Sequence, residues 1–293
     1  MRTLNIIGAG RAARTLAALW RQHGVLAIES VLNRTPASAR DAVAFIGAGR
    51  AADSLHDMPP ADLWMLATPD SEIASAAQAL AAGGKLRAGD VVFHCSGALQ
   101  AGDLRAVFMK DVHLASVHPL KSFADPQDAV RTFAGTYCAA EGEPTALALL
   151  KPAFEQIGAH VTAIDPQFKT IYHAASVMVC NYLTALMEAG LQCYEKAGVP
   201  RATASVMMEP LVRETVDNVF RLGTMKALTG PIARGDHAVV ARQLEALREF
   251  DPSIAEIYRG LGVMAVELSR AQGGASEEAL SALDSLLRHL PKL

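Results

Sequence analysis

The fold is decided by the stretch Leu4-Asn5-Ile6-Ile7-Gly8-Ala9-Gly10-Arg11-Ala12-Ala13. A short apolar run predicts a strand, and the G-x-G-x-x-A pattern leads from it into helix-forming residues. In such a turn, Gly8 allows the sharp exit from the strand, Gly10 lets the backbone approach a pyrophosphate, and Ala13 lets the helix pack close to the sheet. The helix N-terminus offers free N–H groups to phosphates. The stretch therefore predicts a Rossmann-type dinucleotide-binding turn.

Composition sets limits on the class of protein. The 293 residues suffice for two domains, and with 51% hydrophobic and 19% charged residues the chain is expected to be globular. A formal net charge of −3 argues against nucleic acid as the main partner. The scattered cysteines lack a C-x-x-C pair and suggest buried thiols in a reducing compartment. Without a signal-like start or an apolar run of ~20 residues, we expect a soluble cytoplasmic protein that does not enter membranes.

The first half of the chain alternates strand and helix patterns. Expected strands cover residues 4–7, 26–33, 50–54, 62–67, 91–95, 112–117, 132–140 and 160–164. This alternation predicts an α/β fold, a Rossmann-type doubly wound and mostly parallel sheet. From Pro166 onward only helical patterns occur, which predicts an NADP-binding domain at 1–165 and an all-helical substrate and dimerisation domain at 166–293. The helix expected over 166–196 is apolar nearly all round and should be enclosed by other helices.

The end of the second expected strand indicates which cofactor is bound. An acidic residue there would accept hydrogen bonds from the ribose of NAD, but this sequence has Asn33-Arg34-Thr35. The planar guanidinium of Arg34 suits a 2′-phosphate, which predicts NADP(H). The alternative is a solvated loop arginine.

Three further strand ends should meet at the carboxyl edge of the sheet, where ligands bind in such folds. They are Thr68-Pro69-Asp70, Ser96-Gly97 and His118-Pro119. Thr68, Pro69 and Ser96 are candidates for cofactor contacts, and Ser96, Gly97 and His118 for substrate contacts. Each could equally be a turn residue, and His118 a structural histidine.

Candidate catalytic residues lie on the long apolar helix. Lys169 and His173 are four residues apart and share a helix face, with Asn181 offset to one side. Desolvation and the helix dipole should lower the pKa of Lys169, which would suit a general acid. His173 would orient the substrate or share the proton. The alternative places Lys169 on an exposed first turn and His173 in the core.

A second polar stretch runs from Leu228 to Asp236 and reads Leu-Thr-Gly-Pro-Ile-Ala-Arg-Gly-Asp. Gly230-Pro231 should break a helix, and Asp236 should cap a helix over 237–250. Arg234 has no such structural task and is a candidate for binding a substrate carboxylate. The apolar helices beyond it make a homodimer through the helical domain plausible, and no metal site is predicted.

Together, the glycine turn, the stretch 118–123, the helix from Lys169 to Asn181, and the stretch 228–236 resemble a set of two-domain bacterial proteins. Those proteins join a Rossmann-like half to a helical domain of unknown function. The set is similar to ketopantoate reductase, pyrroline-5-carboxylate reductase and the β-hydroxyacid dehydrogenases, so the resemblance implies NADP(H) or NAD(H) and a dimer. Lys169 matches the proton-donating lysine of the ketopantoate reductase Lys-x-x-x-Asn motif, whose asparagine is replaced by His173.

The function expected from these residues is NADP(H)-dependent reduction of a small keto or imino acid between the two domains. The alternative is a non-catalytic NADP(H)-binding sensor or regulator, and a methyltransferase-like site fits less well because it leaves Arg34 unexplained. The cofactor-binding candidates are Gly8, Ala9, Gly10, Arg11, Ala12, Asn33, Arg34, Thr35, Thr68, Pro69 and Ser96.

Overall fold

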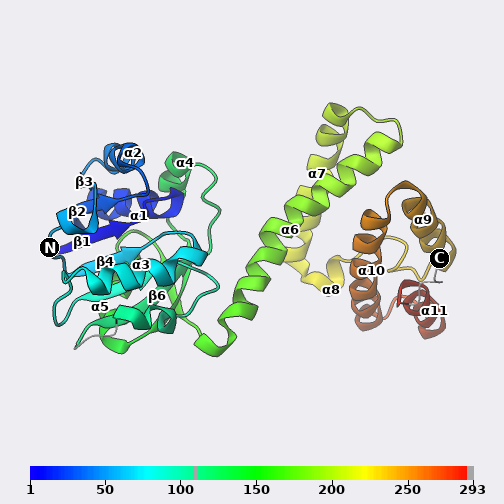
Figure 1. Ribbon diagram of the computed structural model, residues 1–293. Helices are drawn as coiled ribbons and strands as arrows, with labels where there is room; N and C mark the ends of the chain where they lie inside the picture. The colour runs from blue at the N-terminus through cyan, green and yellow to red at the C-terminus, as the bar shows by residue number, and fades with distance from the viewer. Residues whose placement is uncertain (108–110, 289–293) are drawn as a thin grey trace. The chain divides into compact units, whose positions relative to one another are not determined.

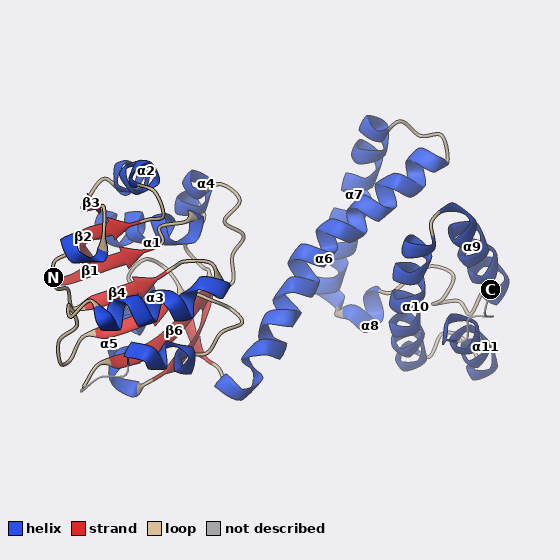
Figure 2. Ribbon diagram, viewed as in Figure 1, coloured by secondary structure: helices blue, strands red, loops and turns tan. Residues whose placement is uncertain are grey.

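The computed structural model describes residues 1–107 and 111–288. Within these residues eight strands form one sheet in the order β3-β2-β1-β4-β5-β6-β7-β8 (Figures 1 and 2). The strands are β1 (Arg2–Ile7), β2 (Leu26–Leu32), β3 (Arg50–Ala52), β4 (Leu63–Leu66), β5 (Val91–His94), β6 (His113–Pro119), β7 (Tyr137–Gly142) and β8 (His160–Ala163). Neighbouring strands are parallel except β6 and β7, which are antiparallel. The predicted doubly wound, mostly parallel sheet is confirmed.

Helices cover both faces of this sheet. One face packs on α1 (Arg11–Gln22), α2 (Pro36–Ile46) and α5 (Pro144–Glu155). The other packs on α3 (Asp70–Ala82) and the short 3₁₀ helix η2 (Ala101–Val107). Central strands are buried on both faces because their side chains alternate between the two layers.

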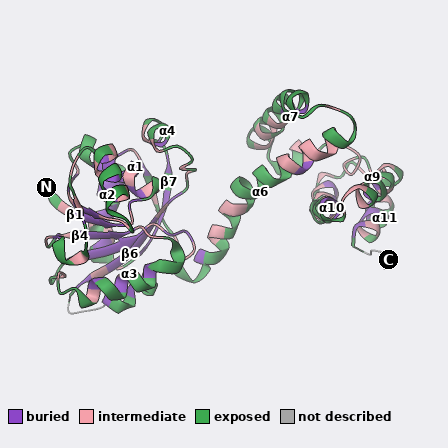
Figure 3. Cartoon of the chain, turned by 45° about the horizontal axis from the view of Figure 1, so that its top comes forward, coloured by how far each residue is buried: buried purple, intermediate pink, exposed green. Residues whose placement is uncertain are grey.

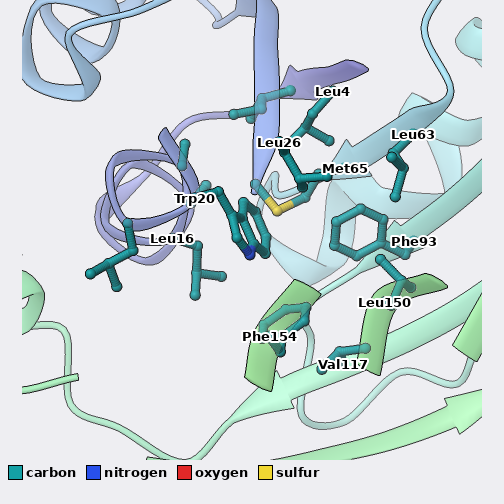
Figure 4. Close-up of a cluster of buried hydrophobic side chains, with 14 of the residues drawn as sticks. Leu4, Leu16, Trp20, Leu26, Leu63, Met65, Phe93, Val117, Leu150 and Phe154 are labelled. Atoms are coloured by element: carbon teal, nitrogen blue, oxygen red, sulfur yellow. The ribbon is translucent and has the colours of Figure 1, made fainter. Parts of the chain in front are cut away.

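Strand β4 shows this alternation most clearly. Leu63 and Met65 enter the core around Trp20 and Phe93, which Figure 4 shows, whereas Trp64 enters the core on the opposite face. The continuous apolar run that predicted this strand therefore has a physical cause, because a strand with a core on each side has no polar face.

The strand expected over 132–140 begins later, as β7 at Tyr137. Thr132 ends α4 (Pro126–Arg131), and Gly135 adopts a left-handed conformation with φ of 84°. This turn places the Gly135 N–H against the Gly158 carbonyl oxygen at 2.8 Å. The apolar pattern that suggested an earlier start belongs to the turn, whose Phe133 is buried in the core.

The C-terminal half is helical, as predicted. It contains α6 (Lys169–Lys196), α7 (Arg201–Leu222), α8 (Thr224–Ala227), α9 (His237–Phe250), α10 (Pro252–Gln272) and α11 (Glu277–Arg288). Asp165 and Asp236 cap the chain segments that follow them, each accepting a bond from a backbone N–H, as predicted. Gly262 allows α10 to approach α11, because a Cβ there would lie 3.0 Å from Leu287.

The chain forms two compact units, residues 1–181 and 182–293. The division falls inside α6, whereas the sequence predicts a boundary after Asp165. The difference arises because the first turns of α6 pack on the sheet: Lys169 pairs with Glu141 on β7, and Tyr172 contacts His118 on β6.

The expectation that other helices of this chain enclose α6 is wrong. Several of its large apolar side chains are exposed, including Met178 at 52% and Val179 at 75% (Figure 3), although Ala189 is buried. By length and composition alone, Pro166–Lys196 could cross a membrane, because an 18-residue window within it has a mean hydropathy of 1.3, although the sequence has no uninterrupted apolar run of ~20 residues. The apolar character of α6 therefore reflects a surface that this chain leaves uncovered, and not a buried core helix.

Candidate functional site

The turn after β1 requires glycine at its first position. Gly8 has a φ of 89°, and its N–H donates to the Leu32 carbonyl oxygen at 2.7 Å. A Cβ on Gly8 would lie 2.6 Å from the Thr68 nitrogen and 2.8 Å from the Ala67 carbonyl carbon. The turn is therefore pressed against the end of β4, and only a residue without a side chain fits there.

The stretch after β2 holds this turn in place. The Asn33 side chain accepts a hydrogen bond from the Ala9 N–H at 2.6 Å and donates to the Ser38 carbonyl oxygen at 2.8 Å. Thr35 caps α2 by accepting from the Ser38 N–H. Asn33 and Thr35, predicted as cofactor contacts, thus have structural tasks, and their contact with a cofactor stays a prediction.

A cavity of about 310 Å³ lies beside the turn. Its lining comprises Gly8, Ala9, Gly10, Arg14, Asn33, Arg34, Ser38, Ala67, Thr68, Pro69 and Glu72. Among the residues described, two buried polar atoms in this lining, Arg14 Nε and Thr68 Oγ1, have no hydrogen-bond partner. Orphaned buried donors are costly, so they indicate a polar ligand. The lining therefore fits the phosphate and ribose groups of a dinucleotide, and exposed Arg34 stands at its rim.

The start of α1 adds to this fit. Gly10 is the N-cap and offers no side-chain acceptor to the first turn, which contains Arg11 and Ala12. A Cβ on Gly10 would meet no atom within 4 Å, so the space above it is open. A helix start left without a cap beside a cavity is suited to binding an anion.

Ser96 organises the loop after β5. Its hydroxyl donates to Asp70 Oδ2 at 2.8 Å and accepts from the N–H groups of Ala98 and Leu99 at 3.1 and 3.0 Å. These bonds join the loop after β5 to the start of α3 at the carboxyl edge of the sheet. Ser96 is buried and its hydroxyl is engaged, so its contact with cofactor or substrate stays a prediction.

Three aromatic rings meet at the same edge. Nδ1 of His118, near the end of β6, lies 3.0 Å from the Tyr172 hydroxyl, and the His173 ring centroid lies 5.7 Å from that of His118. Gly97 makes room for them, since a Cβ there would lie 2.3 Å from His173 Cδ2 and 2.8 Å from His118 Cε1. We call His118, Tyr172 and His173 the ring cluster.

The environment fixes the protonation of His118 and Tyr172. Burial, with help from the nearby His173 and Lys169, lowers the pKa of His118 to about 4, although Asp70 opposes the shift. Burial raises the pKa of Tyr172 to about 12. At neutral pH the cluster therefore pairs a neutral imidazole with a protonated phenol, an arrangement able to hold and pass a proton.

Lys169, in the first turn of α6 before Tyr172 and His173, is buried, with only 1% of its surface exposed. Its ammonium Nζ lies 2.8 Å from Glu141 Oε1 and also donates to Ser116 Oγ. Burial lowers the pKa of Lys169, as predicted, but Glu141 opposes that shift. The amine does not lie on an exposed turn, nor is it open to solvent, so its role as proton donor stays a prediction that this geometry does not favour.

The other predicted residues divide between the units. His173 joins His118, whereas exposed Asn181 lies about 12 Å further along the axis of α6, at 1.5 Å per residue. Arg234 is exposed on the turn before α9, in the second unit. The catalytic role of Asn181 and the substrate role of Arg234 stay predictions.

Sequence reasoning gave no role to Tyr172, Glu141, Asp70 or Arg14, although it placed Asp70 at the carboxyl edge of the sheet. Tyr172 could have been found, because it precedes His173 on the same predicted helix. The role of Glu141 could not be predicted, because a carboxylate near the end of a strand suggests a solvated turn. Its partner, Lys169, lies 28 residues away in the sequence.

Comparison with known proteins agrees with this two-part architecture. A Rossmann-like domain profile matches residues 2–119, and the profile described as Domain of unknown function (DUF2520) matches residues 136–265. No curated protein sequence matches the chain significantly.

Solved structures share the fold over nearly the whole length. The protein TM1727 from Thermotoga maritima is 22% identical with a TM-score of 0.72, covering 92% of this chain and 99% of that one. BF3122 from Bacteroides fragilis, assigned as an NADP oxidoreductase, is 24% identical with a TM-score of 0.71, covering 92% and 97%. Plasmodium falciparum pyrroline carboxylate reductase, solved with NADP bound, is 12% identical with a TM-score of 0.59, covering 97% and 98%. The chain thus contains a Rossmann-like domain followed by a region that matches the DUF2520 domain of unknown function.

Proposed function

We propose that this protein is an NADP(H)-dependent oxidoreductase that reduces a small keto or imino acid. The observation that carries the proposal is the ring cluster, because it provides a proton-holding pair at the same sheet edge as a glycine turn built for a dinucleotide. The similarity of fold to BF3122 and to an NADP-bound pyrroline carboxylate reductase supports the same class of reaction.

The cofactor would be held by the turn and its surroundings. Gly8 and Gly10 would admit the pyrophosphate, the N–H groups of Arg11 and Ala12 would bind it, and Arg34 would pair with the 2′-phosphate. When bound, a nicotinamide cofactor supplies a hydride to the substrate.

The ring cluster would supply the proton. Reduction of a carbonyl or imine adds a proton to its oxygen or nitrogen as well as a hydride to its carbon. Neutral His118 would give its Nε2 proton to the substrate as Nδ1 takes the hydroxyl proton of Tyr172, so the imidazole stays neutral. The tyrosinate that remains would then regain a proton from water. Arg234 is our candidate for binding the carboxylate of the substrate, since a guanidinium binds a carboxylate through two parallel bonds.

The first test is a comparison of cofactor affinities. We expect Arg34→Ala to weaken NADPH binding by about 10- to 100-fold, as loss of a charge-assisted bond to phosphate would. NADH binding should not change, because NADH lacks the 2′-phosphate. Titration calorimetry with both cofactors measures this effect. Arg40→Ala is a matched control that removes the same charge from an exposed position on α2 without altering the cavity lining.

An Arg34→Ala protein that keeps its NADPH preference would exclude the role of Arg34. Turnover is then measured with the wild-type protein as the oxidation of NADPH in the presence of each member of a panel of 2-keto acids and cyclic imino acids. Binding without turnover across that panel would favour a sensor or regulator in place of an enzyme.

We further propose that the protein is a cytoplasmic homodimer formed through the helical domain. Helix α7 exposes Val206 at 72% and Phe220 at 87%, and such large apolar side chains are usually covered in a stable assembly. Light scattering after gel filtration should give twice the mass of 31.0 kDa. Phe220→Glu should shift the mass toward the monomer, and a wild-type monomer at micromolar concentration would contradict the proposal.

A further inference from the structure

The Lys169–Glu141 pair is a buried ion pair that the proposed chemistry does not use. Both side chains are almost fully buried, at 1% and 6% exposed. Glu141 Oε1 also accepts a hydrogen bond from the Ala101 N–H at 2.8 Å, so each member of the pair has further partners. A buried pair whose polar atoms are satisfied in this way is often retained because it selects one geometry.

The pair lies beside β6 and β7, which run antiparallel to each other. Ser116 on β6 and Glu141 on β7 lie opposite each other in the antiparallel register. Lys169 Nζ donates to both of them. A single ammonium from the first turn of α6 therefore joins the helix to both strands.

The same contact fixes where the next residues of α6 lie. His118 follows Ser116 by two positions on β6, so both side chains point to the same face of the sheet. Tyr172 follows Lys169 by three positions on α6, so both lie on one face of the helix. Lys169 therefore contacts Ser116, and Tyr172 contacts His118 one step further along both elements. The start of α6 is thus held on β6 at two points.

We infer that Lys169 and Glu141 are positioning residues that hold the start of α6 on β6, so that Tyr172 meets His118. This inference rests on the proposed function, and it assigns the proton to the ring cluster instead of Lys169. Lys169 is poorly suited to donate, because its amine is enclosed and already bonded to Glu141 and Ser116.

The charges around His118 make the inference measurable. Lys169 and His173 face it from α6, together with the hydroxyl of Tyr172, and Asp70 faces it from α3. Removing the Lys169 cation should raise the titration midpoint of His118 above its value of about 4, because a positive charge that opposes protonation is lost. Loss of the Tyr172 bond should also move the ring nitrogen resonances of His118.

The test is a double-mutant cycle with Lys169→Met, Glu141→Gln and the two combined. The control is Lys151→Met, which breaks an exposed pair with Glu155 on α5. Nitrogen NMR of the histidine rings, assigned with a His118→Asn protein, is recorded for each variant. Tyr172→Phe provides the reference spectrum for a broken contact, and NADPH affinity and turnover are measured alongside.

We expect each single variant to shift the His118 resonances toward those of Tyr172→Phe and to lower kcat by about 10- to 100-fold, as misplaced groups do. The double variant should be no worse than either single one, with KM and NADPH affinity within about twofold of wild type. Unchanged His118 resonances in Glu141→Gln would overturn the inference. A fall in kcat that occurs in Lys169→Met but not in Glu141→Gln would also overturn it, because Lys169 itself would then be the proton donor.

The design separates this inference from the proposed function. If Lys169→Met does not fold, the near-isosteric Glu141→Gln and the double variant still answer the question. If the wild type neither binds NADPH nor oxidises it, the proposed function fails, but the His118 resonances still report whether the pair holds Tyr172 in place.

Discussion

Replacing Gly8 by alanine is expected to abolish NADPH binding and to lower the free energy of unfolding by about 3 kcal/mol. Two effects combine. The φ of 89° is strained for alanine, and the new methyl group would overlap backbone atoms of Ala67 and Thr68 at 2.8 and 2.6 Å. Because these are backbone atoms at the end of a central strand, they cannot rotate away as a side chain could.

Gly10→Ala is the matched comparison for this variant. Gly10 has a φ of −71°, which alanine adopts freely, and its Cβ would meet no atom within 4 Å. We therefore expect Gly10→Ala to keep wild-type stability and yet bind NADPH at least about 10-fold more weakly, because the methyl group would occupy the approach of the pyrophosphate. Urea unfolding and titration calorimetry measure the two quantities separately. Full NADPH affinity in Gly10→Ala would show that the turn does not hold a dinucleotide.

Replacing His118 by asparagine is expected to lower kcat by about 100- to 10,000-fold, the range found when a general acid or base is lost. Cofactor affinity should be retained, because His118 does not line the cavity at the glycine turn. Tyr172→Phe should lower kcat less, since the imidazole remains. Exposed His56→Asn is the control and should behave as wild type. A His118→Asn enzyme with full turnover would remove the ring cluster from the mechanism.

The same variant should also change how stability depends on pH. The pKa of His118 falls from an ordinary 6.5 to about 4 on folding, so the unfolded chain binds more protons between these values. The stability contribution is complete above pH 6.5 and is lost as the pH falls toward 4, up to about 3 kcal/mol. Urea unfolding from pH 7 to pH 4 should show this loss in the wild type and a smaller loss in His118→Asn. Equal slopes in the two proteins would mean that His118 titrates normally.

Local sequence patterns were sufficient to predict features that are encoded within a single turn, helix or strand. The glycine turn could be predicted because its φ, its close approach to the sheet and its helix start are all encoded within a few residues. Asp165 and Asp236 could be predicted as caps for the same reason, since a cap bonds residues two or three positions away. His118 could be placed at the carboxyl edge because the parallel sheet brings strand ends together.

Local patterns did not identify partners that lie far away in the chain. A lysine beside a histidine on one helix face suggested a proton donor, and that role stays a prediction. The same pattern gave no indication that Lys169 pairs with Glu141 on the antiparallel strand. The apolar circumference of α6 suggested an enclosed helix, yet its apolar side chains are exposed within this chain. Periodicity reports which faces are apolar, but it does not say which molecule covers them.

By itself, the sequence determined a Rossmann-like half built on the Gly8–Gly10 turn, a helical second half, and the set of polar residues at the strand ends. These follow from conformational limits and short-range periodicity, which act within one element. Only the tertiary structure decided that Glu141 takes up the Lys169 amine and that Tyr172 reaches His118. Such pairings depend on the register between β6, β7 and α6, and register is set by packing between elements that are distant in sequence.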